Sequence, residues 1–136
     1  MDSRNASAEN VSKLEKGSRL FVLVDDNEDD AFLLSRQVLS GGMEGKVRVF
    51  NEAGEAKTFL AANPAFILIV ALSMRRDAGF ELLNWVRAQP QMQKTLIVAV
   101  GLSERAPDVQ RAFDLGANAY YAKGIDLQSF RRRCRI

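Results

Sequence analysis

Short aliphatic runs alternate along the chain with segments whose apolar residues repeat at helical spacing. The runs are rich in β-branched residues and have apolar side chains on both faces, as expected of strands buried inside a sheet. The predicted strands are 20–24, 46–50, 66–72, 96–100 and 117–122. Amphipathic helices are predicted between and after them, over 28–40, 52–62, 78–88 and 107–115, with a short last helix from Asp126.

This alternation predicts an α/β domain with a parallel sheet covered on both faces. Right-handed crossovers would make it a doubly wound, three-layer (βα)5 fold with strand order 2-1-3-4-5. Residues 1–18 are polar and mixed in charge, so we expect a flexible N-terminal leader followed by one domain over 19–136.

Composition excludes several classes of function. The 136 residues are 47% hydrophobic and carry a net charge of only +2, which does not favour nucleic acid or an anionic membrane as a partner. The chain has no histidine and a single cysteine, Cys134, so histidine-dependent catalysis and cysteine zinc sites are excluded. No stretch is apolar for long enough to span a bilayer, and a cytoplasmic protein is the default expectation.

Charged residues gather where the predicted strands end. Asp25 and Asp26 close the first strand and Lys123 follows the last one, and in such folds ligands bind at these carboxyl ends. Paired carboxylates suit Mg²⁺, and a lysine could bind a phosphoryl oxygen. Alternatively, the acidic run that ends at Asp30 only favours the dipole of the following helix.

Together these segments resemble the response regulator receiver domain of two-component signalling. The resemblance covers about 19–135 and rests on FVLVDDNEDD, ILIVALSMRRDAGFELLNWVR, LIVAVGLSE and VQRAFDLGANAYYAKGIDL. It implies that Asp25 and Asp26 hold the family's Mg²⁺ site. It also implies that Lys123 is the phosphate-contacting lysine and Tyr120 the aromatic that changes rotamer on activation.

Three positions depart from the family pattern. The residue that matches the phosphoacceptor aspartate is Ala71, whose methyl group cannot attack phosphorus. Gly101 matches the hydroxyl residue that bonds the phosphoryl group, and Gly124 replaces the usual proline. We therefore expect a vestigial Mg²⁺ site that is weak or empty, no other cofactor, and Lys123 paired directly with Asp25 or Asp26.

Nearby residues leave alternatives open. Asp77 could be a displaced acceptor, although we expect it to cap the third predicted helix. Ser73 and Ser103 are interpreted as loop hydroxyls that satisfy local backbone groups. Arg75 and Arg76 are either solvated loop charges or contacts to Asp25, Asp26 or a partner. The basic tail 131–135 is interpreted as a solvated face, and Trp85 as a packing residue.

The resemblance implies a signalling module, not an enzyme, that acts by protein contact without phosphorylation. Its expected partner is a histidine kinase or an effector protein. A homodimer would form through the fourth helix, fifth strand and fifth helix, a surface that includes Tyr120. The rival functions are a working phosphoacceptor that uses Asp77 or a serine, and a small-ligand (flavin-like) binder.

Overall fold

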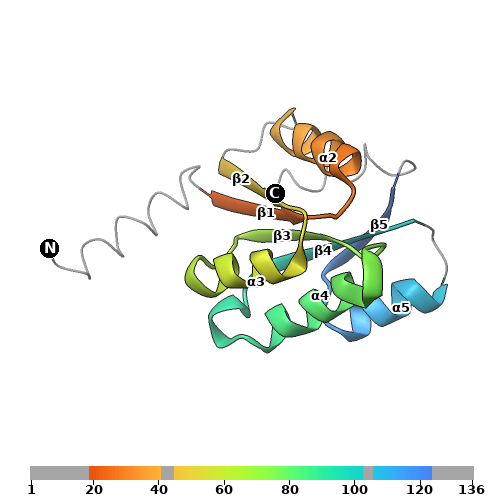
Figure 1. The fold of residues 1–136 in the computed structure, drawn as a ribbon. Helices are drawn as coiled ribbons and strands as arrows, with labels where there is room; N and C mark the ends of the chain where they lie inside the picture. The colour runs from red at the N-terminus through yellow and green to blue at the C-terminus, as the bar shows by residue number, and fades with distance from the viewer. Residues whose placement is uncertain (1–18, 41–44, 103–105, 124–136) are drawn as a thin grey trace, which may run out of the picture.

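The computed structural model describes residues 19–40, 45–102 and 106–123. Elements carry the labels of Figure 1, in which the first described helix is α2. The strands are β1 (Arg19–Val24), β2 (Gly45–Phe50), β3 (Ile67–Ala71), β4 (Leu96–Gly101) and β5 (Ala119–Ala122). The α-helices are α2 (Glu28–Ser40), α3 (Ala53–Ala62), α4 (Ala78–Ala88) and α5 (Ala106–Asp114), with short 3-10 turns η1 (Arg75–Asp77) and η2 (Pro90–Met92).

The five strands form one parallel sheet in the order β2-β1-β3-β4-β5. Its centre is β3, every residue of which is buried. The register pairs Val24 of β1 with Val70 of β3, and Ala71 with Val100 of β4. The ends of β1, β3 and β4 therefore lie side by side, and the predicted doubly wound fold is confirmed.

Two hydrophobic clusters cover the two faces of the sheet. Alternate residues of β1 serve the two clusters, since Val22 and Val24 pack on one face while Phe21 and Leu23 pack on the other. Among the described helices, α3, α4 and α5 cover the first face and α2 covers the second. Trp85 of α4 packs against the first cluster, as predicted.

Arg87 fixes the connections that lead to the last strands. Its guanidinium donates to the carbonyls of Gly116, Met92 and Gln93 and to Asn118 Oδ1. Burial lowers the pKa of Arg87 from its ordinary value because desolvation disfavours the charged form. These hydrogen bonds tie α4 to the turn that precedes β5, the strand that carries Tyr120 and leads to Lys123.

The five predicted strands and the helices predicted over 28–40, 52–62, 78–88 and 107–115 are all present, with boundaries shifted by up to two residues. Several predictions lie outside the described residues: the leader 1–18, Ser103, Gly124, the helix from Asp126, and the tail 131–135 with Cys134. Within the described part, no helix has the length and hydropathy needed to cross a membrane.

Candidate functional site at the carboxyl ends of the strands

Asp25 follows β1 directly and is completely buried. Its backbone continues the sheet, because its N–H donates to the Phe50 carbonyl at 3.0 Å and its carbonyl accepts the Asn51 side-chain amide at 3.0 Å. Its Oδ1 accepts the Asn27 N–H at 3.0 Å. A buried carboxylate needs such partners, since losing its hydration is otherwise costly.

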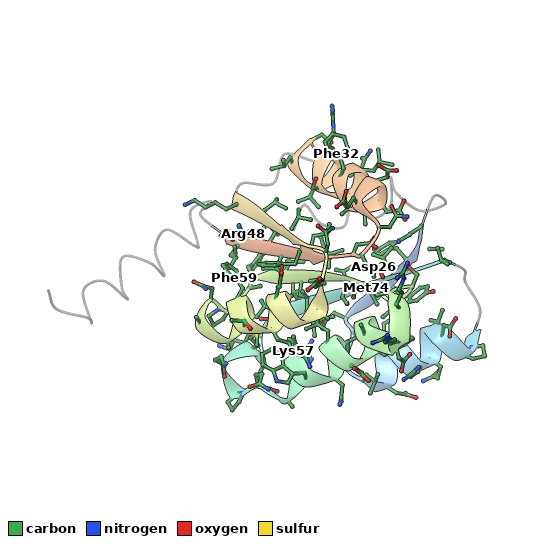
Figure 2. The ribbon with its side chains drawn as sticks, viewed as in Figure 1. Asp26, Phe32, Arg48, Lys57, Phe59 and Met74 are labelled. Carbon is green, nitrogen blue, oxygen red and sulfur yellow. The ribbon has the colours of Figure 1, made fainter. Side chains whose placement is uncertain are left out.

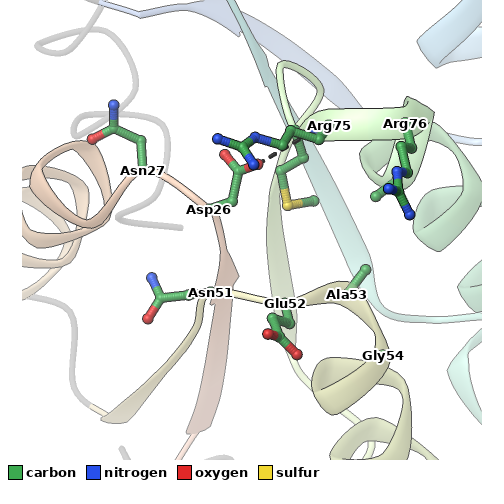
Figure 3. Close-up of a pocket in the computed structure, with 10 residues that line it drawn as sticks. Asp26, Asn27, Asn51, Glu52, Ala53, Gly54, Arg75 and Arg76 are labelled. Carbon is green, nitrogen blue, oxygen red and sulfur yellow. Dashed lines mark hydrogen bonds between the residues drawn. The ribbon is translucent and has the colours of Figure 1, made fainter.

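Asp26 and Asn27 have roles that differ from those of Asp25. Asp26 is exposed, and its Oδ2 accepts the backbone N–H of Arg75 at 3.1 Å (Figure 3). Asn27 caps α2, because its Oδ1 accepts the N–H of Asp30 at 3.0 Å. The cap of the first helix is therefore an asparagine, and helix capping does not account for Asp25 or Asp26.

Lys123 neutralises Asp25 from the end of β5. Its Nζ lies 2.9 Å from Asp25 Oδ2 and 2.9 Å from Asp30 Oδ2, and it donates to Ser73 Oγ at 3.2 Å. The Lys123 side chain is 12% exposed and that of Asp25 only 1%. The predicted direct ion pair is present with Asp25 and extends to Asp30. Ser73 accepts from this lysine, which corrects its interpretation as a purely local loop hydroxyl.

The environment of Lys123 keeps it charged. Burial lowers its pKa, but hydrogen bonds and attraction from Asp25 and Asp30 outweigh that effect, and the pKa is raised above its ordinary 10.5. Because the folded-state pKa is the higher one, the stabilisation is complete below the ordinary pKa. It is lost only as pH rises through the raised value.

Ala71 ends β3 beside this ion pair and is 2% exposed. The backbone of α4 approaches it closely, since a Cβ added at Gly79 would overlap the Ala71 carbonyl. The next N–H, of Leu72, donates to the Val100 carbonyl at 2.8 Å. The side chain at the end of the central strand is thus a packed methyl group, which cannot attack phosphorus.

Asp77, the nearest alternative carboxylate, does not cap α4. It stands at the N-cap position with φ 63° but makes no side-chain capping hydrogen bond, so that prediction was wrong. Its carboxylate instead accepts both terminal nitrogens of Arg111 on α5, one of them at 3.0 Å. Arg111 also lies over the Phe80 ring, 3.9 Å from its centroid, which fixes this loop against α5.

Tyr120 occupies the space next to Gly101. A Cβ added at Gly101 would overlap the Tyr120 hydroxyl, so even alanine there conflicts with the present position of the ring. Tyr120 packs against the hydrophobic cluster formed with α3, α4 and α5. Glycine at 101 therefore does more than remove a hydroxyl, because it makes room for the inward tyrosine.

A polar cleft of about 780 Å³ opens beside Asp26 (Figure 3). The loops after β1, β2 and β3 line it, and its charged residues are Asp26, Glu52, Arg75 and Arg76. Met74 also lines the cleft. The Arg48 guanidinium carbon on β2 lies over the Phe59 ring of α3, 4.7 Å from its centroid (Figure 2). Arg75 thus contacts Asp26 through its backbone N–H, and Arg76 lines the cleft.

The carboxylate oxygens at the carboxyl ends of the strands already have protein partners. Both Asp25 oxygens are engaged, one by Lys123 and one by the Asn27 N–H, while Asp26 Oδ2 is engaged by Arg75 N–H. Among the described residues, no group of three or more acidic, histidine or cysteine side chains is arranged to hold a metal ion. Mg²⁺ would compete with Lys123 for Asp25 Oδ2.

A family model of the response regulator receiver domain matches residues 21–135. The chain belongs to this family. Its members are generally signalling modules of two-component systems. No match was found among curated proteins.

Solved structures show the same fold. A protein of Chloroflexus aurantiacus assigned to the response regulators is 25% identical (TM-score 0.77, covering 85% of this chain and 93% of that chain). The Vibrio cholerae chemotaxis protein CheY4 is 21% identical (TM-score 0.75, 85% and 94% covered). The phosphorylated cyanobacterial phytochrome response regulator RcpA is also 21% identical (TM-score 0.72, 86% and 89% covered).

Sequence reasoning predicted the Asp25–Lys123 ion pair but missed Asp30, Ser73 and Arg111 as partners. Asp30 had a detectable signal, because a helix that begins at Glu28 places residue 30 in its first turn, next to the strand end. The sequence carried no signal for Arg111, because its partner Asp77 is 34 residues away and is placed by the left-handed backbone conformation of Arg76 and Asp77.

We predict that Lys123→Met destabilises the domain by about 3–5 kcal/mol, because it leaves the buried Asp25 charge unpaired. Asp25→Asn together with Lys123→Met should cost less than the sum of the two single changes, by about 1 kcal/mol or more. Equilibrium urea denaturation measures both. Lys46→Met, at an exposed position of β2, is the control, and additive effects would contradict the pairing.

Gly101→Ala should displace the Tyr120 ring and destabilise the domain by about 1–3 kcal/mol through overpacking. Gly54→Ala is the matched control, because a Cβ there meets nothing within 4 Å. Urea denaturation gives the stability, and the ring resonances of Tyr120 report its position. Unchanged Tyr120 resonances in Gly101→Ala would show that the ring does not depend on this glycine.

Proposed function

We propose that this receiver domain signals by protein contact and accepts no phosphoryl group. The observation that carries the proposal is Ala71, buried at the end of the central strand beside Asp25 and Lys123. Acyl-phosphate formation needs a carboxylate as nucleophile, and a methyl group offers no lone pair. The other residues at the carboxyl ends of the strands surround the Lys123–Asp25 ion pair, which forms without a phosphoryl group.

Two structural neighbours mark the contrast. RcpA was solved in its phosphorylated form, and a Burkholderia pseudomallei response regulator was solved with a phosphorylated aspartic acid and a calcium ion. In this chain the three donors of Lys123 already face Asp25, Asp30 and Ser73, so binding a phosphoryl oxygen would cost one of these contacts. We infer that Mg²⁺ binds weakly or not at all, for the same reason.

The state of the domain is then set by packing. The Tyr120 ring occupies the space that Gly101 leaves. Glycine has no hydroxyl that could bond a phosphoryl group and couple it to this ring. We infer that the surface around α5 and β5 binds a histidine kinase or effector protein in this one arrangement. Exposed Leu102 and Phe113 on that side supply apolar contact area, at 69% and 44% exposure.

Both oxygens of the rival acceptor Asp77 accept hydrogen bonds from Arg111. A bidentate guanidinium lowers the nucleophilicity of a carboxylate by holding its negative charge. The Asp77 carboxylate is therefore a structural partner of α5 in this proposal.

We predict no mass gain of one phosphoryl group when the protein is incubated with acetyl phosphate and Mg²⁺ and analysed by intact mass spectrometry. A receiver domain that carries the acceptor aspartate, treated in parallel, shows that the donor is active. A stable phosphoryl adduct on this chain would refute the proposal. Its loss in Asp77→Asn or in Ser73→Ala would then identify the acceptor.

A further inference from the structure

The side of α2 that faces away from the sheet carries large apolar residues. Ala31, Leu34 and Val38 are buried against the sheet, whereas Phe32, Leu33 and Leu39 are 59%, 52% and 55% exposed. Figure 2 marks Phe32 on this helix, which is the only described helix on its face of the sheet. Exposed apolar side chains gathered on one helix are typical of an interaction surface.

Two opposite charges flank the centre of this surface. Asp29 precedes Phe32 by three residues and Leu33 by four, and Arg36 follows Leu33 by three residues and Phe32 by four. Residues at these spacings are neighbours on a helix surface, so all four share one face. Both charged residues are exposed, and Arg36 lies over the Phe32 ring, 5.7 Å from its centroid. Asp29 and Arg36 are about 10 Å apart along the helix axis, too far to pair within one helix.

This arrangement is self-complementary. Asp29 and Arg36 are equidistant from the midpoint between Phe32 and Leu33. If two copies of α2 pack antiparallel about a two-fold axis through that midpoint, Asp29 of each copy faces Arg36 of the other. A two-fold interface requires such a match, because the same patch serves both partners.

We propose that a second copy of this chain docks on α2 through Phe32 and Leu33, with Asp29 and Arg36 pairing across the two-fold axis. The surface around α5 and β5 then stays available to the partner protein. A single helix face buries less area than a standard interface, so the dimer is weak and forms at high protein concentration. The inference does not depend on whether the domain accepts a phosphoryl group.

Analytical ultracentrifugation of the full chain, from about 10 μM to about 1 mM, tests it. The weight-average mass of the wild type should rise from one chain towards two. Asp29→Arg and Arg36→Asp should each weaken self-association by about tenfold or more, since like charges then face each other across the axis. An equimolar mixture of the two variants should associate again, because the arginines at positions 29 and 36 of one variant then face the aspartates at positions 36 and 29 of the other.

Phe32→Ser should also weaken the dimer, whereas Glu55→Arg and Lys94→Asp, exposed charge changes outside α2, should leave it unchanged. Circular dichroism checks that each variant keeps its helices. A wild type that stays monomeric over the whole range, whether another protein or another part of the chain covers α2, overturns the proposal. So does a mixture of the two charge variants that remains monomeric.

Discussion

The Asp25 carboxylate is buried where the central strands end, so its negative charge must be neutralised from within the fold. Lys123 does this from the end of β5 and reaches Asp30 on α2 and Ser73 after β3 as well. One ammonium group therefore connects β1, α2, the loop after β3 and β5. Because Lys123 and Asp25 are nearly buried, solvent screens their attraction little. The positions of these four segments relative to one another therefore depend on this cluster.

The same cluster shows how the end of the central strand is packed with Ala71, not an acidic residue, at that position. With Ala71 in place of a carboxylate, fewer negative charges converge on Lys123, which pairs with Asp25 and Asp30. Gly101 then leaves room for the Tyr120 ring, which packs inward against the hydrophobic cluster. In the proposed function, Ala71 removes the phosphoryl signal, and Gly101 makes room for the Tyr120 ring that would respond to it.

Much of this could be predicted from the sequence, because it depends on local patterns. The aliphatic runs located the strands, and the rule that parallel strands end at one edge brought Asp25 and Lys123 together. The partners that were missed depend on tertiary detail. Asp30 joins the ion pair through the way α2 starts at Asn27, and Asp77 turns away from its helix because Arg76 and Asp77 adopt left-handed conformations. The close approach of Tyr120 to Gly101 likewise appears only once β4 and β5 are paired.

Titration of the protein with Mg²⁺ in a calorimeter measures directly whether Lys123 or a metal ion neutralises this edge. With Lys123 bound to Asp25, the account predicts little or no binding at millimolar Mg²⁺, and a clear increase in affinity when Lys123→Met frees the carboxylate. Tight binding of Mg²⁺ by the unmodified protein would contradict it, since the ion would then hold the position assigned to the lysine.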